Sequence, residues 1–194
     1  MNIIAEETRM TMNLLNKFGA LTLEQINKMC NGTKFNPKPM LAYLSNSRMI
    51  QFLDDNYAVL QNRPEYNPET LYCLWVMLDK IKSDNILKSS ELRSANPCDN
   101  GIEVCFINDA KMIEYIAFID KANIAKVSLI QDTFYTTTGV TPGYEEKCHR
   151  LYTFVVDDEE VLDILAEMQL TIPYIVAFIE GDLTGIPSIE YYKL

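Results

Sequence analysis

The stretch of sequence that decides the fold runs from Leu21 to Leu60 and reads LTLEQINKMCNGTKFNPKPMLAYLSNSRMIQFLDDNYAVL. Thr22 can cap a helix N-terminus through its hydroxyl, and Gln25 can return the hydrogen bond, as in a capping box. Apolar residues follow at a spacing of three, at Leu23, Ile26 and Met29. This pattern predicts a short helix with one buried face, which ends at Asn31-Gly32 in a left-handed turn.

A second helix is predicted directly after that turn. Asn36 can cap its N-terminus, and Pro37 fits its first turn, where no intrahelical amide hydrogen bond is lost. Met49-Ile50 can close the same core after the chain leaves the helix. The residues that can point inward from the helix are Met40, Leu41 and Leu44. The opposite face carries Lys38, Ala42, Tyr43, Ser45 and Asn46.

Two strand-like segments complete the stretch. Ile50–Leu53 and Tyr57–Leu60 are rich in strand-forming residues and flank Asp54-Asp55-Asn56, which is typical turn chemistry. The run Met40-Leu41-x-x-Leu44-x-x-x-x-Met49-Ile50, followed by this hairpin, resembles the winged helix-turn-helix DNA-binding superfamily. The resemblance covers roughly the first third of the chain. The whole chain more loosely resembles winged-helix and replication-relaxation proteins of bacterial mobile elements, in its order of elements and its length.

The resemblance implies that the second helix enters the major groove of DNA. Lys34 and Lys38 would hold phosphate groups, and Tyr43 and Asn46 would approach the bases. The complete set of candidate DNA-binding residues is Lys34, Asn36, Lys38, Tyr43, Asn46 and Arg48. From Leu21 to Ile50 the sequence has four basic residues and one acidic residue, a local net charge of +3.

Two features depart from the winged-helix pattern. Many members of the superfamily have a glycine between the recognition helix and the wing, where this chain has Arg48. The left-handed turn usually supplied by that glycine must therefore be made differently. The wing tip is acidic, with Asp54 and Asp55 where a basic contact to the DNA backbone is expected. Both features weaken the expected wing contacts.

Charge is distributed unevenly over the 194 residues, whose net charge is −10. Residues 1–65 hold seven basic and six acidic residues, whereas residues 66–194 hold ten and twenty-one. This asymmetry and the change in hydrophobic period predict two domains. We expect a winged-helix domain with an additional C-terminal helix over residues 1–82, a linker over residues 83–101 and an acidic domain over residues 102–194.

The additional helix begins at Asn67-Pro68. It carries an apolar stripe that includes Trp75, and this stripe forms either part of the core or a dimerisation surface. Strands are predicted at 102–107, 112–119, 151–156, 174–179 and 189–192, with helices at 122–134 and 157–168 and a loop at 135–143. The spacing of the apolar residues in 112–119 also fits a helix. The predicted fold class is α+β, with a small mixed sheet covered by one or two helices.

Catalytic chemistry is not expected. The five cysteines form no C-x-x-C pair, and His149 is the only histidine, so we predict no metal and no cofactor. Asp109-Ala110-Lys111 and Glu145-Glu146-Lys147 have the acid and lysine of a nuclease but fall in turns. The acidic run from Asp157 to Glu160 favours a helix N-terminus over a metal site.

The sequence leaves two functions open. The first is a non-enzymatic, cytoplasmic DNA-binding protein that regulates transcription or assists replication or transfer of a mobile element. It would bind double-stranded DNA, form a homodimer and contact a protein partner through its acidic domain, with no membrane segment. The alternative is a protein-interaction module whose winged helix no longer binds DNA, which the acidic wing tip and the charge of −10 favour.

Overall fold

The computed structural model describes residues 3–31, 35–139 and 149–194 and confirms the α+β class. The first part of the chain contains a small antiparallel sheet in the order β1-β3-β2. Its elements are α1 (Ile3–Phe18), β1 (Ala20–Thr22), α2 (Leu23–Cys30), α3 (Pro37–Asn46), β2 (Ile50–Leu53) and β3 (Tyr57–Leu60). β2 and β3 form the predicted hairpin, and β1 pairs with the other edge of β3. This pairing ties the hairpin to the start of α2.

The second part of the chain forms a five-stranded mixed sheet in the order β4-β5-β6-β7-β8. Its strands are β4 (Val104–Ile107), β5 (Ile113–Phe118), β6 (Arg150–Val156), β7 (Tyr174–Glu180) and β8 (Ser188–Tyr192). The three central strands are parallel and the two outer pairs are antiparallel. β5 confirms the strand prediction for 112–119 over the helical alternative.

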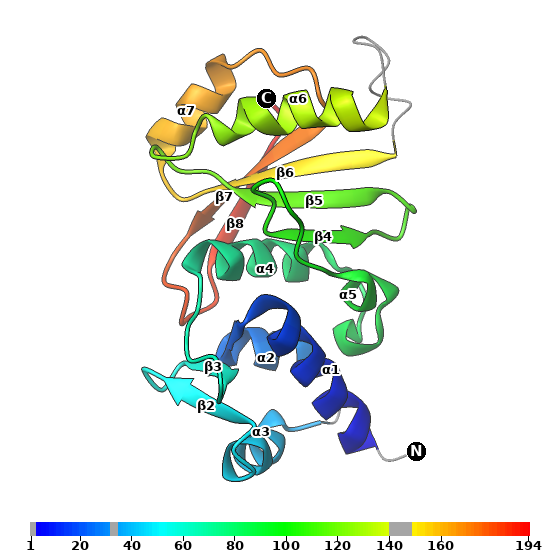
Figure 1. Cartoon of the computed structure of the whole chain (residues 1–194), viewed down its shortest axis with the longest axis vertical. Coiled ribbons are helices and arrows are strands. Elements are labelled where there is room, and N and C mark those ends of the chain that lie inside the picture. Colours follow the sequence, from blue (N-terminus) through cyan, green and yellow to red (C-terminus); the bar gives the residue numbers. More distant parts are fainter. Residues whose placement is uncertain (1–2, 32–34, 140–148) are drawn as a thin grey trace.

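Helices cover both faces of this sheet (Figure 1). α6 (Lys126–Thr138) and α7 (Glu159–Glu167) lie on the face turned away from the first part of the chain. α4 (Pro68–Lys80) lies on the opposite face, between the sheet and α1 and α2. One hydrophobic core therefore runs from α1, α2 and α3 through α4 into the sheet, and a second core lies under α6 and α7.

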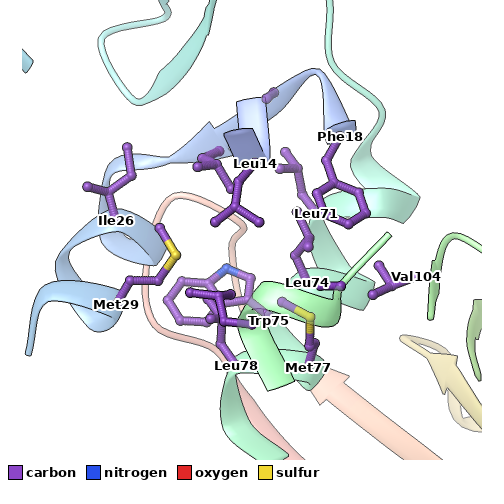
Figure 2. Close-up of a cluster of buried hydrophobic side chains, with 14 of the residues drawn as sticks. Leu14, Phe18, Ile26, Met29, Leu71, Leu74, Trp75, Met77, Leu78 and Val104 are labelled. Carbon is purple, nitrogen blue, oxygen red and sulfur yellow. The ribbon is translucent and has the colours of Figure 1, made fainter. Parts of the chain in front are cut away.

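Trp75 lies at the centre of the first core. Its side chain is fully buried on α4, and it packs among side chains of α1 and α2 (Figure 2). Burial of the whole stripe means that these apolar residues form the core rather than a free dimerisation surface. The labelled neighbours in the close-up include Leu14, Ile26, Met29, Leu74 and Leu78.

Residues 83–101, expected as a linker, are folded onto the first core. They hold the 3₁₀ helix η1 (Ile86–Lys88) and the short helix α5 (Ser90–Ser94). Ser89 caps α5, because its hydroxyl accepts a hydrogen bond from the Leu92 amide at 3.1 Å. Leu87 and Leu92 are buried, so this segment packs apolar side chains against the core although its composition is mostly polar. The boundaries at 82 and 102 stay a prediction.

The loop predicted at 135–143 is wrong in its first residues, since α6 continues to Thr138. The threonine hydroxyls at positions 136, 137 and 138 donate to carbonyls one turn back along the helix, which lets polar β-branched residues stay helical. Gly139 then ends the helix with a φ of 65°. Residues 140–143 lie outside the described ranges.

The start of α2 confirms the predicted capping box. The Thr22 hydroxyl accepts from the Gln25 amide at 3.0 Å, and the Gln25 side chain accepts from the Thr22 amide at 3.0 Å. The helix ends at Cys30 with Asn31 as its C-cap, as predicted, and Asn31 has an extended backbone with a φ of −61°. Gly32 lies outside the described residues.

Replacing Thr22 by alanine should lower the free energy of unfolding by about 1–2 kcal/mol. The substitution removes the hydroxyl and leaves the amide of Gln25, a buried residue, without its acceptor. Urea denaturation followed by circular dichroism measures the change. Thr136→Ala is the matched control, because this exposed hydroxyl bonds only within α6 and its loss should change stability by less than about 0.5 kcal/mol. Equal effects of the two variants would contradict the capping role.

Candidate functional site

The candidate site is the outward face of α3, at the end of the molecule opposite α6 and α7 (Figure 1). α3 begins where the Asn36 side chain accepts a hydrogen bond from the Lys38 amide at 3.0 Å. Pro37 occupies the first turn, as predicted. Met40, Leu41 and Leu44 are buried in the first core and fix the rotation of the helix about its axis. Pro37 is buried as well, and the exposed positions of α3 are Lys38, Pro39, Ala42, Tyr43 and Asn46.

The outward face of α3 carries polar and basic groups without a carboxylate. Lys38, Ala42 and Asn46 are exposed and lie four residues apart, so they follow one line along the helix. Tyr43 lies beside this line and is 63% exposed. α3 contains no aspartate or glutamate, whereas the chain as a whole has 27 of these residues. The face therefore differs in charge from the rest of the molecule.

The structure places the candidate residues in different settings. Lys38, Tyr43 and Asn46 share the exposed face of α3. Asn36 is exposed, but its side-chain oxygen is engaged in the helix cap, which leaves its amide nitrogen as a donor. Arg48 follows α3 and is also exposed. Lys34 lies outside the described residues.

Arg48 itself makes the left-handed turn between α3 and the hairpin. Its φ is 55°, and its amide donates to the Ser45 carbonyl at 2.9 Å. The next amide, of Met49, donates to the Leu44 carbonyl at 3.0 Å and closes the end of the helix. The position usually filled by glycine is thus held in the same conformation by a charged residue, whose side chain points to solvent.

The hairpin tip is acidic and tightly turned. Asp54 and Asp55 both have positive φ, at 48° and 56°, and are exposed. The Asn56 side chain donates to the Asp54 carbonyl at 2.8 Å, and the Asn56 amide donates to the Leu53 carbonyl at 3.1 Å. The two carboxylates therefore make the tip of the β2–β3 hairpin acidic.

Sequence reasoning missed the apolar part of this surface. Met49 was expected in the core but is 42% exposed, while its neighbour Ile50 is buried. Adjacent residues at a strand start point to opposite faces, so one of the two had to face outward. Phe52 is 36% exposed on β2. Large apolar side chains thus accompany Tyr43 after α3. Strand alternation could have revealed the exposure of Met49, whereas Phe52 lies on the same face of β2 as the buried Ile50 and its exposure had no such signal.

Acidic groups elsewhere are used structurally. Asp158 caps α7, accepting from the Glu160 amide at 2.8 Å, as the capping interpretation predicted. Lys121 bridges Asp158 and Glu160 at 2.8 and 2.6 Å. Hydrogen bonding from Lys121 lowers the pKa of Asp158. Within the described ranges, no three His, Cys, Asp or Glu side chains are placed to hold a metal ion.

Glu103 holds three segments together beside a cavity of about 380 Å³. Its carboxylate accepts from Lys126 at 2.7 Å and from the Phe118 amide at 2.8 Å, and it contacts the thiol of Cys73. Arg63 also lines the cavity and pairs with Glu65 at 3.1 Å. These charged groups satisfy each other, so the cavity has the character of a packing gap between segments.

The acid and lysine pairs considered for a nuclease are not assembled into one site. Asp109 and Lys111 are exposed in the turn between β4 and β5, and Lys111 has a φ of 62°. Glu145 and Lys147 lie outside the described residues. In the parts of the chain that the structure describes, no helix is long and apolar enough to cross a membrane.

Comparisons with family models, with curated proteins and with solved structures give no match to this chain. The functional proposal therefore rests on α3 and its surroundings.

Proposed function

We propose that the protein binds double-stranded DNA through α3, as a winged helix-turn-helix protein. The observation that carries this proposal is the carboxylate-free, exposed face of α3, with Lys38, Tyr43 and Asn46, in a chain of net charge −10. The order of α2, a turn, α3 and the β2–β3 hairpin supports it. A helix with its side chains is about 10–12 Å wide, which matches the major groove.

Different side chains on this face would contact the phosphates and the bases. Lys38, in the first turn of α3, and Arg48, just beyond its end, would neutralise phosphates on either side of the groove. Asn46 can donate to and accept from an adenine edge, and Tyr43 can stack or donate a hydrogen bond. The Asn36 amide group, whose oxygen is engaged in the cap, would donate to phosphate.

Binding by one chain should be weak and sensitive to salt. Each neutralised phosphate contributes a slope of about −0.9 to the dependence of log affinity on log salt concentration. Two or three cationic contacts on each chain give a slope of roughly −2 to −3. The acidic tip and the acidic second part of the chain oppose binding further. A dimer reading two half-sites would supply the missing affinity.

The double variant Lys38→Ala/Arg48→Gly tests the face directly. Glycine keeps the positive φ of position 48 without strain, so the variant removes charge and preserves the turn. DNA affinity should fall about tenfold, with a salt slope less negative by about 2. Fluorescence anisotropy with mixed-sequence duplex DNA measures both quantities.

The matched control is Lys111→Gly/Lys193→Ala. It removes the same charge, and Lys111 also has a positive φ, of 62°. Both residues are exposed and belong to the second part of the chain, far from α3 in Figure 1. The control should leave affinity within about twofold of the wild type. An equal loss in both variants would assign binding to net charge alone and would overturn the role of α3.

A second candidate function is binding of a protein partner by the same surface. The observation that favours it is the exposure of Tyr43, Met49 and Phe52, at 63%, 42% and 36%, beside the acidic hairpin tip. Aromatic and methionine side chains are enriched in the centres of protein interfaces. On this proposal, the double variant Lys38→Ala/Arg48→Gly would leave partner binding largely intact, whereas Tyr43→Ala would abolish it.

A proposal for the biological process rests on the loose resemblance of the whole chain to winged-helix and replication-relaxation proteins of bacterial mobile elements. We propose a regulator or an accessory protein for replication or transfer of a mobile element, with the acidic second part contacting a partner protein or a second copy.

A further inference from the structure

Cys98 and Cys105 lie side by side where the chain turns from α5 into β4. Asn96 and Cys105 exchange two backbone hydrogen bonds, at 2.9 and 2.8 Å, as an isolated antiparallel bridge. This bridge folds the segment 96–98 back along the start of β4. The side chains of Cys98 and Cys105 are hydrogen-bonded to each other. The two thiols are free.

Cys98 and Cys105 are less buried than the other described cysteines. Cys98 and Cys105 are partly exposed, whereas Cys30 and Cys73 are buried in the first core. Cys98 also lines a cavity of about 270 Å³ on the α6 side of the sheet. The polar residues of the cavity lining include Asp99, Asn100, Thr137 and Arg150.

The surroundings give the two thiols different roles. The hydrogen bond from Cys98 and the nearby Lys17 ammonium lower the pKa of Cys105 to about 7. Lys17 is held in place by its hydrogen bond to the Ala95 carbonyl at 2.6 Å. The pKa of Cys98 is raised by the hydrogen bond with Cys105 and by burial. These surroundings favour Cys105 over Cys98 as the thiol that loses its proton first.

We propose that Cys98 and Cys105 form a dithiol modification site, which small-molecule disulfides such as oxidised glutathione convert to an intramolecular disulfide. The Cys105 thiolate attacks one sulfur of the oxidant, forms a mixed disulfide and releases one glutathione thiolate. Cys98 then loses its proton to water and attacks the Cys105 sulfur, releasing the second glutathione thiolate. Two protein thiols are oxidised and one small disulfide is reduced to two thiols.

The disulfide would close the segment from Cys98 to Cys105 at the place where α5 joins the sheet. The chain just before this segment meets α1, because Lys17 donates a hydrogen bond to the Ala95 carbonyl. The modification is independent of the DNA-binding proposal, since neither thiol belongs to α3.

The test uses the full chain, folded and reduced, with oxidised glutathione as the oxidant. After reaction the remaining thiols are alkylated and the protein is cut with trypsin. Arg93 and Lys111 bound one tryptic peptide, 94–111, which contains both cysteines and none of the others. The expected product is this peptide without alkyl groups and two hydrogen atoms lighter, while Cys30 and Cys73 are alkylated only after unfolding.

Single variants separate the two roles. Cys98→Ser keeps a hydroxyl that can donate to Cys105, so one glutathione should remain attached to Cys105. Cys98→Ala removes the donor, and attachment at Cys105 at neutral pH should be roughly fivefold slower than in Cys98→Ser. Circular dichroism confirms that each variant is folded. Full alkylation of both thiols in the wild type, or a stable mixed disulfide without ring closure, would overturn the proposal.

Discussion

Replacing Trp75 by alanine should lower the free energy of unfolding by about 3–5 kcal/mol. The indole is fully buried at the centre of the first core, where α4 meets α1 and α2 (Figure 2). Lys28 lies over the ring with its ammonium 5.7 Å from the ring centroid. Among the described residues the indole nitrogen has no hydrogen-bond partner, so the loss comes from packing and the cavity that remains.

Urea denaturation followed by far-ultraviolet circular dichroism is the suitable measurement, because Trp75 is the only tryptophan and its fluorescence disappears in the variant. Tyr43→Ala is the matched control, since it removes an aromatic side chain that is 63% exposed. The control should change stability by less than about 0.5 kcal/mol. A Trp75→Ala effect as small as the control would show that α4 is not the centre of the core.

Removing the ammonium of Lys80 should cost about 3–5 kcal/mol of stability. Lys80 on α4 pairs with Glu114 on β5, and their side chains are only 13% and 7% exposed. In Lys80→Met the stem is kept, but the Glu114 carboxylate stays buried with Asn108 as its remaining side-chain partner among the described residues, at 2.8 Å. An uncompensated buried charge is more costly than the intact pair is stabilising.

The double variant Lys80→Met/Glu114→Gln provides the control. It removes both charges and keeps the size of each side chain, so most of the lost stability should return. Thermal unfolding of the wild type, both single variants and the double variant completes the cycle. Additive losses in the double variant would contradict a direct interaction between α4 and β5 through this pair.

Much of the fold follows from local sequence signals. The capping box at Thr22, the caps at Asn36 and Asn67 and the acidic start of α7 each depend on residues within one helical turn. Runs of β-branched and aromatic residues likewise located β4 to β8 within a few residues. The inward face of α3 was readable because Met40, Leu41 and Leu44 repeat at helical spacing.

Features that depend on distant pairing were not readable. Lys80 and Glu114 are far apart in sequence, and neither position signals that the other is buried beside it. Cys98 and Cys105 come together only because Asn96 pairs with the edge of β4. The packing of 83–101 onto the first core was hidden by its polar composition, since Leu92 needs partners from other elements to be buried.

The same limit applies to the candidate site. The polar face of α3 was predicted from the spacing of its apolar residues. The left-handed conformation of Arg48, however, depends on how α3 meets the hairpin. The exposure of Met49 depends on that turn as well. The surface is therefore more apolar than the sequence indicated, and DNA binding and protein binding have to be separated by measurement.

Fluorescence anisotropy of the wild-type protein with mixed-sequence duplex DNA, at low and near-physiological salt, tests the central claim most directly. A sizing run beside it gives the oligomeric state in which binding occurs. We expect saturable binding at low salt that weakens with a slope of roughly −2 to −3 for each chain on a log–log plot. A folded protein that shows no binding even at low salt would contradict DNA binding through α3.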